Sequence, residues 1–212
     1  SCLEAVVLTH TDQDHINGVM EVLEEGKKGW LTVKHLLYPC WMEETEQGRE
    51  LQKLAKEAGA SCQGIRAGDQ LELGNAEAAV IYPGDEETVT EPNAGSLVLC
   101  WEWAGVRTLF TGDLPEEKER ELLQKLPACE ILQVGHHGSA TSTCQEFLDR
   151  VQPSLAVISC ALTNRYGHPA PDTVERLEKN GCEIRYTMKG GAVTVGQRGK
   201  EIRVEEYVTG GQ

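Results

Sequence analysis

Short apolar segments alternate with amphipathic segments along this 212-residue chain, and this alternation constrains the fold more than any other feature. Strand-like runs such as residues 4–8 and 131–134 are followed by polar stretches and then by segments whose apolar residues have helical spacing. Such alternation favours an α/β fold in which helices cover a sheet. No repeat, low-complexity segment or long linker divides the sequence, so we predict one α/β domain over residues 1–212.

The predicted elements can be placed from periodicity and from Pro and Gly stops. Predicted strands are 4–8, 36–38, 78–82, 97–101, 108–111, 131–134, 156–159 and 183–186. Predicted helices are 17–25, 43–58, one that begins at Pro115, 143–151 and 171–180. The end of the chain resembles a hairpin, with strands 192–195 and 201–207 around a turn at 196–199. The apolar runs are far shorter than the roughly 20 residues of a membrane-spanning helix, so we expect no direct membrane insertion.

Charge and cysteine content narrow the function classes. The 20 Lys and Arg residues stand against 34 Asp and Glu residues, which gives a formal net charge of −14. A chain this acidic repels polyanions, whereas nucleic-acid-binding domains normally carry a basic face. The eight cysteines are scattered and include no CxxC pair, so we predict single thiols, although the spacing alone leaves disulfides open.

Metal-competent side chains directly follow several predicted strands. His10, Asp12, Asp14 and His15 come after the strand that ends at Leu8. Alternate residues of an extended loop, such as 10, 12 and 14, can point the same way, and the start of the next helix carries His15 round. The alternative is a solvated turn with a helix cap. Asp113 ends another strand, where it is equally well read as a cap ahead of the next helix.

Two further loops carry histidines. The segment 134–139 (VGHHGS) places His136 and His137 between glycines, and the segment 164–169 (NRYGHP) holds His168. Five of the six histidines therefore lie in three loops, which is the main sequence evidence for an active site. His35 stands alone before a strand and is predicted to be a packing residue.

Five motifs follow one another along the chain: HxDxDH from His10 to His15, NAGSLVL at 93–99, TGD at 111–113, VGHHGS at 134–139 and NRYGHP at 164–169. In this order they resemble the metallo-β-lactamase-like domain of the ComEC family of DNA-internalisation competence proteins. The wider superfamily has a second histidine where this chain has Asp12, and Asn93 stands near the place of another superfamily histidine. Both departures are typical of the ComEC branch.

The resemblance implies a four-layer αββα sandwich with metals at the edge between two sheets. It implies that the chain is a fragment of a longer protein and can lack the opening strands of the fold. By residue, it implies His10 and Asp12 at one metal, Asp14 and His15 at the other, Asp113 bridging and His136 completing a site. His137 is a further candidate. Carboxylate and amide oxygens are harder ligands than imidazole nitrogen and suit hard cations, so Mn²⁺ is favoured, with Zn²⁺ or Mg²⁺ as alternatives.

The implied activity is a metal-dependent nuclease, a hydrolase that cleaves DNA phosphodiesters during DNA uptake in natural transformation. Two cations can lower the pKa of a shared water and clamp the phosphodiester oxygens, with Asp14 and His168 as the candidate catalytic residues. His168 can bind a phosphate oxygen or protonate the leaving oxygen. His168 can instead hydrogen-bond its own loop. His137, Ser139 and Asn164 can contact phosphate, and Ser139 and Asn164 are equally well explained as turn residues.

Two other functions stay open: a two-metal hydrolase of a cell-wall or choline phosphodiester or of a carbonyl substrate, and a catalytically idle, metal-bearing module that positions DNA. The resemblance implies that the parent protein lies in a bacterial cell membrane, with the rest of that membrane channel and the DNA-uptake machinery as partners. The net charge predicts weak DNA binding by this fragment alone.

Overall fold

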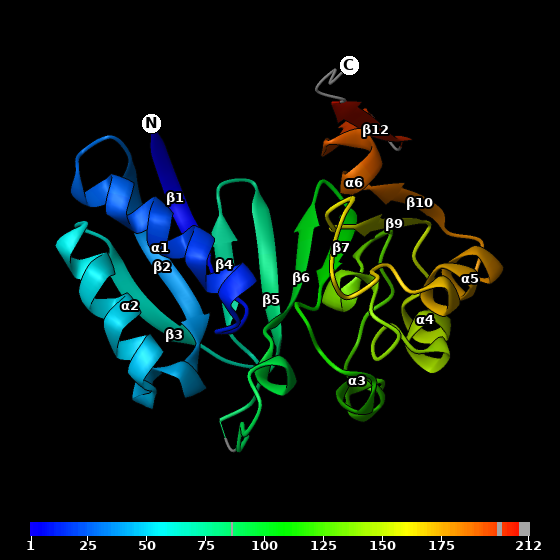
Figure 1. Ribbon diagram of the computed structural model, residues 1–212, viewed down its shortest axis with the longest axis horizontal. Helices are drawn as coiled ribbons and strands as arrows, with labels where there is room; N and C mark the ends of the chain where they lie inside the picture. Colours follow the sequence, from blue (N-terminus) through cyan, green and yellow to red (C-terminus); the bar gives the residue numbers. More distant parts are fainter. Residues whose placement is uncertain (86, 199–200, 208–212) are drawn as a thin grey trace. The chain divides into compact units, whose positions relative to one another are not determined.

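The computed structural model describes residues 1–85, 87–198 and 201–207, and it divides them into two compact units (Figure 1). The first unit comprises residues 1–105 and 110–114. The second comprises residues 106–109 and the described residues from Pro115 onward. The single domain expected from the sequence stays a prediction.

Three parallel strands form one sheet of the first unit. They are β1 (Cys2–Val7), β2 (Thr32–Pro39) and β3 (Ser61–Ile65), in the order β1-β2-β3. Parallel neighbours need long crossover connections, and the helices α1 (Gln13–Lys27) and α2 (Glu46–Glu57) provide them. Both helices lie against this sheet in Figure 1.

Antiparallel strands form the other layer of the first unit. They are β4 (Gln70–Leu73), β5 (Ala76–Tyr82) and β6 (Val98–Trp103), with β5 paired to both neighbours. Leu36 of β2 belongs to the same core cluster as Leu51 of α2, whereas the next residue, Leu37, belongs to the cluster of β5 and β6. Because successive side chains of a strand alternate between its faces, β2 is buried on both sides. The first unit is therefore layered as helices, parallel sheet and antiparallel sheet.

The helix predicted over residues 43–58 begins later than expected. A 3₁₀ helix, η1 (Cys40–Glu44), comes first, and Thr45 then caps α2 by accepting the Gly48 N–H at 3.0 Å. A β-carbon at Gly48 would lie 1.8 Å from the Met42 carbonyl oxygen, so only glycine fits. The threonine cap interrupts the helix that the apolar spacing alone predicts.

The second unit repeats the parallel α/β pattern. In spatial order, the strands of its larger sheet are β10 (Glu183–Tyr186), β9 (Leu155–Ile158), β8 (Ile131–Gln133) and β7 (Val106–Phe110), whose last residue belongs to the first unit. Its longer helices are α3 (Glu116–Leu122), α4 (Gln145–Val151) and α5 (Pro171–Lys179). Phe147 and Leu148 of α4, Ile158 of β9 and Leu177 of α5 are almost completely buried, which anchors these helices.

Each of the eight strands predicted between residues 4 and 186 overlaps an observed strand, whereas β3 and β4 were not predicted. Both are short edge strands with few apolar residues, so they carry little periodic signal. The hairpin at the end of the chain is confirmed as β11 (Ala192–Arg198) paired with β12 (Glu201–Tyr207). Its turn was predicted too early, because residues 196–198 still pair with β12, and the rest of the predicted turn lies outside the described residues.

The cysteines are single thiols, as predicted. None of the eight is in a disulfide, and Cys100, Cys129, Cys144 and Cys182 are buried. No helix of the described residues is both long and apolar enough to cross a bilayer.

Candidate metal centre

The first motif lies partly in a helix. Helix α1 begins at Gln13, four residues before the predicted start, with Asp12 at its N-cap. The N–H groups of His15 and Ile16 both donate to the Asp12 carbonyl, at 3.0 and 2.9 Å. The expectation that residues 10, 12 and 14 alternate along an extended loop is therefore wrong, because these hydrogen bonds wind the chain into the first helical turn. That turn carries Asp14 and His15.

The Asp113 loop packs tightly against the first motif. Gly112 has a φ of +54°, and a β-carbon there would lie 3.0 Å from the β-carbons of both Ser96 and Thr9. The Asp113 N–H donates to Ser96 Oγ at 3.1 Å, and the Leu97 N–H donates to the Thr9 carbonyl at 2.9 Å. This packing holds the Asp113 carboxylate, which is 4% exposed, beside the start of α1.

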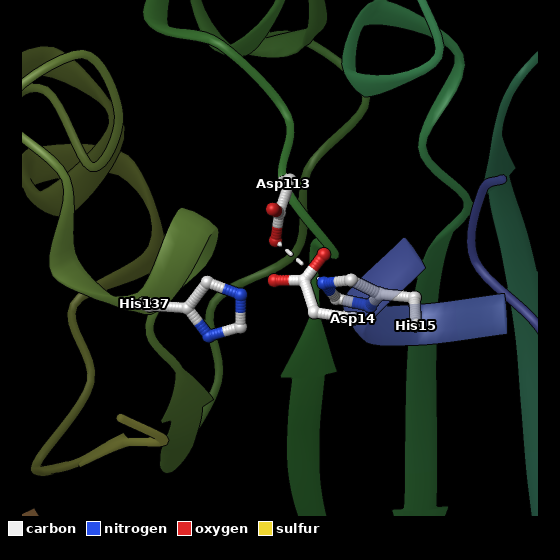
Figure 2. Close-up of side chains that lie close together, drawn as sticks. All are labelled: Asp14, His15, Asp113 and His137. Atoms are coloured by element: carbon white, nitrogen blue, oxygen red, sulfur yellow. Dashed lines mark ion pairs between the residues drawn. The ribbon is translucent and has the colours of Figure 1, made fainter. Parts of the chain in front are cut away.

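Two histidines face the two oxygens of the Asp113 carboxylate. His15 Nε2 lies 3.3 Å from Oδ1, and His10 Nε2 lies 3.8 Å from Oδ2. His10 Nε2 also lies 4.0 Å from Asp12 Oδ2. Asp14, His15 and Asp113 each offer a ligand atom, and these atoms lie within 4.8 Å of one another. Figure 2 shows these three side chains turned toward one another.

These spacings suit cation ligands. Ligand atoms about 2.1 Å from an ion lie about 3.0 Å apart at right angles, about 3.4 Å apart in a tetrahedron and about 4.2 Å apart when opposed. The separations of 3.3 to 4.0 Å among His10, His15, Asp12 and Asp113 fall in this range. The donor set of imidazoles and carboxylates therefore fits divalent ions.

Burial and neighbouring carboxylates set the protonation of this cluster. Burial disfavours the charged form of His15, but the hydrogen bond with Asp113 and the charges of Asp113, Asp14 and Asp12 outweigh it, so the pKa of His15 is raised. His10 is completely buried, and its ring centroid lies 4.2 Å from that of His15. Thr9 Oγ1 lies 3.0 Å from His10 Nδ1, a contact that turns Nε2 toward the carboxylates.

In the second unit, the loop after β8 holds two histidines in a strained backbone. His136 and His137 in the 3₁₀ segment η3 (Gly135–Gly138) have φ values of +49° and +55°, a left-handed conformation that is uncommon outside glycine. Ser142 Oγ donates to the Gly135 carbonyl at 2.9 Å, and the Ala170 N–H donates to the Gly138 carbonyl at 2.8 Å. Such strain persists only where surrounding contacts fix the chain, as these do.

His137 has a defined orientation. Its Nδ1 lies 2.8 Å from the carbonyl oxygen of Ser159, and because a carbonyl only accepts, Nδ1 carries the proton. In the neutral ring this leaves the lone pair on Nε2, the usual arrangement of a metal-binding histidine. Figure 2 also draws His137. The family resemblance implies His136 as a ligand and His137 as a further candidate, and the ligand role of each stays a prediction.

The loop around His168 is closed by Asn164. Asn164 Oδ1 accepts the His168 N–H at 2.9 Å, and Nδ2 donates to the carbonyls of His168 and Ala161 at 2.7 and 3.1 Å. The His168 ring lies 5.8 Å from that of His136. Asn164 thus has the turn role that the sequence left open, and its contact with substrate stays a prediction, as does that of His168.

Ser139 likewise has a local role. Its Oγ lies 3.0 Å from Thr141 Oγ1 and accepts the Thr141 N–H at 3.3 Å, while its carbonyl accepts from Thr173 Oγ1 at 2.8 Å. Ser139 is 7% exposed. These bonds make it a turn residue, and contact with phosphate stays a prediction.

Several supporting residues were not singled out from sequence. Arg176 of α5 donates to the carbonyls of Thr143 and Ser142, at 3.0 and 3.1 Å, and so fixes the end of the histidine loop. Ser96 was visible only as part of the NAGSLVL segment. His35, predicted to be a packing residue, is exposed and hydrogen-bonds Ser61 Oγ at 2.7 Å, because its side chain lies on the surface of the β2 and β3 pair.

Comparison with known proteins identifies the family of this chain. A model described as the metallo-beta-lactamase superfamily matches residues 3–161. The chain is 34% identical over 193 residues to ComE operon protein 3 of Bacillus subtilis, covering 90% of this chain and 24% of that protein. It is 28% identical over 193 residues to Recombination protein 2 of Haemophilus influenzae, covering 91% of this chain and 22% of that protein. The chain thus spans about a quarter of the length of these relatives.

A solved structure shows the same fold. The diiron beta-hydroxylase CmlA of Streptomyces venezuelae aligns with a TM-score of 0.58 at 14% identity, covering 86% of this chain and 43% of that chain. At this identity the likeness concerns the fold alone. It confirms the predicted α/β sandwich.

Proposed function

The chain belongs to the metallo-β-lactamase superfamily, and from this premise we propose that it is a metal-dependent nuclease that cleaves DNA phosphodiesters during DNA uptake. Members of this superfamily are metal-dependent hydrolases, and the curated relatives are ComEC-family competence proteins. One observation carries the proposal: the two oxygens of the buried Asp113 carboxylate face two different histidines. A carboxylate so placed suits a bridge between two cations.

The proposed ligands divide into two sets around Asp113. His10 and Asp12 face Oδ2 and would hold one ion, while His15 faces Oδ1 and, with Asp14, would hold the second. His136 of the second unit keeps its predicted role as a further ligand, with His137 as the other candidate. When bound, the ions supply Lewis-acid stabilisation of the charge that develops on phosphate and lower the pKa of water.

The remaining groups orient the ligands and move protons. Thr9 holds the His10 ring, and Ser96 holds the backbone of Asp113, so both ligands are fixed before any ion binds. His168, with a reference pKa near neutrality, is the proposed general acid that protonates the leaving oxygen. The carboxylate-rich donor set favours Mn²⁺ or Mg²⁺ over softer ions.

The test compares two aspartates in equivalent positions. Asp14 lies in the first turn of α1 and Asp172 in the first turn of α5, and both are exposed. Each Asp→Ala change loses a similar favourable interaction with a helix N-terminus, but only Asp14→Ala removes a proposed ligand. We expect wild type and Asp172→Ala to bind about two Mn²⁺ per chain by elemental analysis and to cleave a labelled oligonucleotide.

Asp14→Ala and chelator-treated protein should retain at most about 1% of that cleavage, since mutating a residue at the reacting centre typically costs 10²-fold or more. Wild-type protein that binds no metal would refute the proposal. Turnover confined to small phosphodiesters would point to a different hydrolase, and bound metal without any turnover would point to an idle module.

A further inference from the structure

An exposed tyrosine adjoins the histidines of the second unit. The ring of Tyr166 is stacked on that of His168, with centroids 5.7 Å apart and planes at 19°. The His168 ring in turn meets the His136 ring edge-on at 5.8 Å. Three rings therefore run in a row from a predicted metal ligand to the surface, where Tyr166 is 66% exposed.

Arg165 stands beside this tyrosine. Its guanidinium carbon lies 4.9 Å from the centre of the Tyr166 ring, and its Nη2 donates to the Tyr166 hydroxyl at 2.7 Å. The loop is built before any ligand arrives, because Asn164 bonds both the N–H and the carbonyl of His168. A large exposed aromatic side chain on a fixed loop needs little ordering to bind a flat ligand.

The sequence around this loop carries no acidic side chain. The chain has a net charge of −14, yet residues 150–171 contain no Asp or Glu and include Arg150 and Arg165. Residues 131–145, which include β8 and the loop that carries His136 and His137, also contain no Asp or Glu. The acidic residues are thus concentrated elsewhere in the sequence, and these two segments of the second unit do not repel phosphate.

We propose that Tyr166 is a stacking platform for one unpaired nucleobase of the strand that is cleaved, with Arg165 contacting the adjacent phosphate. Aromatic rings bind bases of single strands in this way without reading sequence, because every base has a flat face. Bases inside a duplex are already stacked on each other. The platform therefore selects single-stranded DNA or frayed ends. This inference rests on the proposed nuclease function, because it concerns the DNA strand that is cleaved.

The first experiment compares two oligonucleotides of equal length, one with bases and one with abasic sites throughout its centre. Both offer the same phosphodiesters, so only a base-binding site distinguishes them. We expect the KM of wild type for the normal strand to be about tenfold lower than for the abasic strand. Tyr166→Ala should reduce this ratio to about one, and Tyr166→Phe, which keeps the ring, should preserve most of it.

Tyr207→Ala is the matched control, since Tyr207 is also exposed, at 60%, but lies at the end of β12. It should keep the wild-type ratio. A ratio unchanged in Tyr166→Ala would overturn the platform, and so would an equal loss in Tyr207→Ala. Using the ratio cancels any effect of Tyr166 on the orientation of His168, which would change both substrates alike.

A binding measurement separates failure of the platform from failure of the nuclease proposal. A single strand with one 2-aminopurine loses fluorescence when that base stacks on an aromatic ring, and this can be read with chelator present and no turnover. Quenching by wild type and Tyr166→Phe, with at least fivefold weaker binding by Tyr166→Ala, supports the platform even if no cleavage occurs. Equal quenching by Tyr166→Ala would overturn it.

Discussion

A buried glutamate in α3 makes the stability of the second unit depend on pH. Glu119 is completely buried, and its two carboxylate oxygens accept the N–H groups of Thr143 and Cys144 at 2.7 and 2.8 Å. Burial raises the pKa of Glu119 from 4.5 to about 7, although the two N–H donors oppose the rise. The folded protein therefore holds this proton over a pH range in which the unfolded chain has lost it.

The direction and size of this pH dependence follow from the difference in proton binding between the folded and unfolded states. Stability falls with rising pH wherever the folded state binds more protons, here between about pH 4.5 and 7. A pKa raised from 4.5 to about 7 corresponds to roughly 3 kcal/mol of stability, most of which is lost between about pH 5 and 8.5. Glu119→Gln lacks the titrating group and cannot show this loss.

The assay is urea denaturation of wild type and Glu119→Gln in chelator, followed by far-UV circular dichroism. Gln has one side-chain oxygen and can accept only one of the two N–H groups well, so the variant is destabilised by an amount that does not change with pH. The informative quantity is therefore how the difference in free energy of unfolding between wild type and variant changes with pH. We expect wild type to lose roughly 2 to 3 kcal/mol relative to the variant between about pH 5 and 8.5.

Glu117→Gln, on the exposed side of α3, measures the effect of removing one negative charge without a buried carboxylate. A difference between wild type and Glu119→Gln that stays constant with pH would refute the reasoning. A change in the opposite direction would show that the two N–H donors outweigh burial.

Three further substitutions test other parts of the structure. Gly138→Ala should lower the free energy of unfolding by about 1 to 3 kcal/mol, because φ is +81° and the new β-carbon would lie 2.7 Å from Pro169 Cβ; an unchanged Tm would contradict this. Ser96→Ala removes the acceptor for the Asp113 N–H and should weaken Mn²⁺ binding about tenfold by calorimetry, whereas unaltered affinity would show that Ser96 does not position the loop. Leu51→Ala should cost about 2 to 5 kcal/mol in urea denaturation, since this side chain is fully buried between α2 and the sheet, and a loss below about 1 kcal/mol would show that the site collapses around the cavity.

From the sequence alone we could predict the α/β class, most of the strands and the loops that carry the histidines. These features follow from local patterns, because burial on a strand or helix face leaves a periodic trace and metal-competent side chains gather after strands. The edge strands β3 and β4 left too few apolar residues to be recognised. The boundary between η1 and α2 at Thr45 depends on one capping side chain, which the spacing of apolar residues does not reveal.

The arrangement of the first cluster depends on tertiary packing, which the sequence pattern did not predict. The sequence placed Asp14 on a loop, whereas two hydrogen bonds to the Asp12 carbonyl wind Asp14 and His15 into α1. It left Asp113 equally readable as a helix cap. The structure buries this carboxylate against Ser96 and turns its two oxygens toward His10 and His15, residues about a hundred positions away along the chain. The physical reason is that orientation depends on packing between distant segments, and no local pattern encodes that packing.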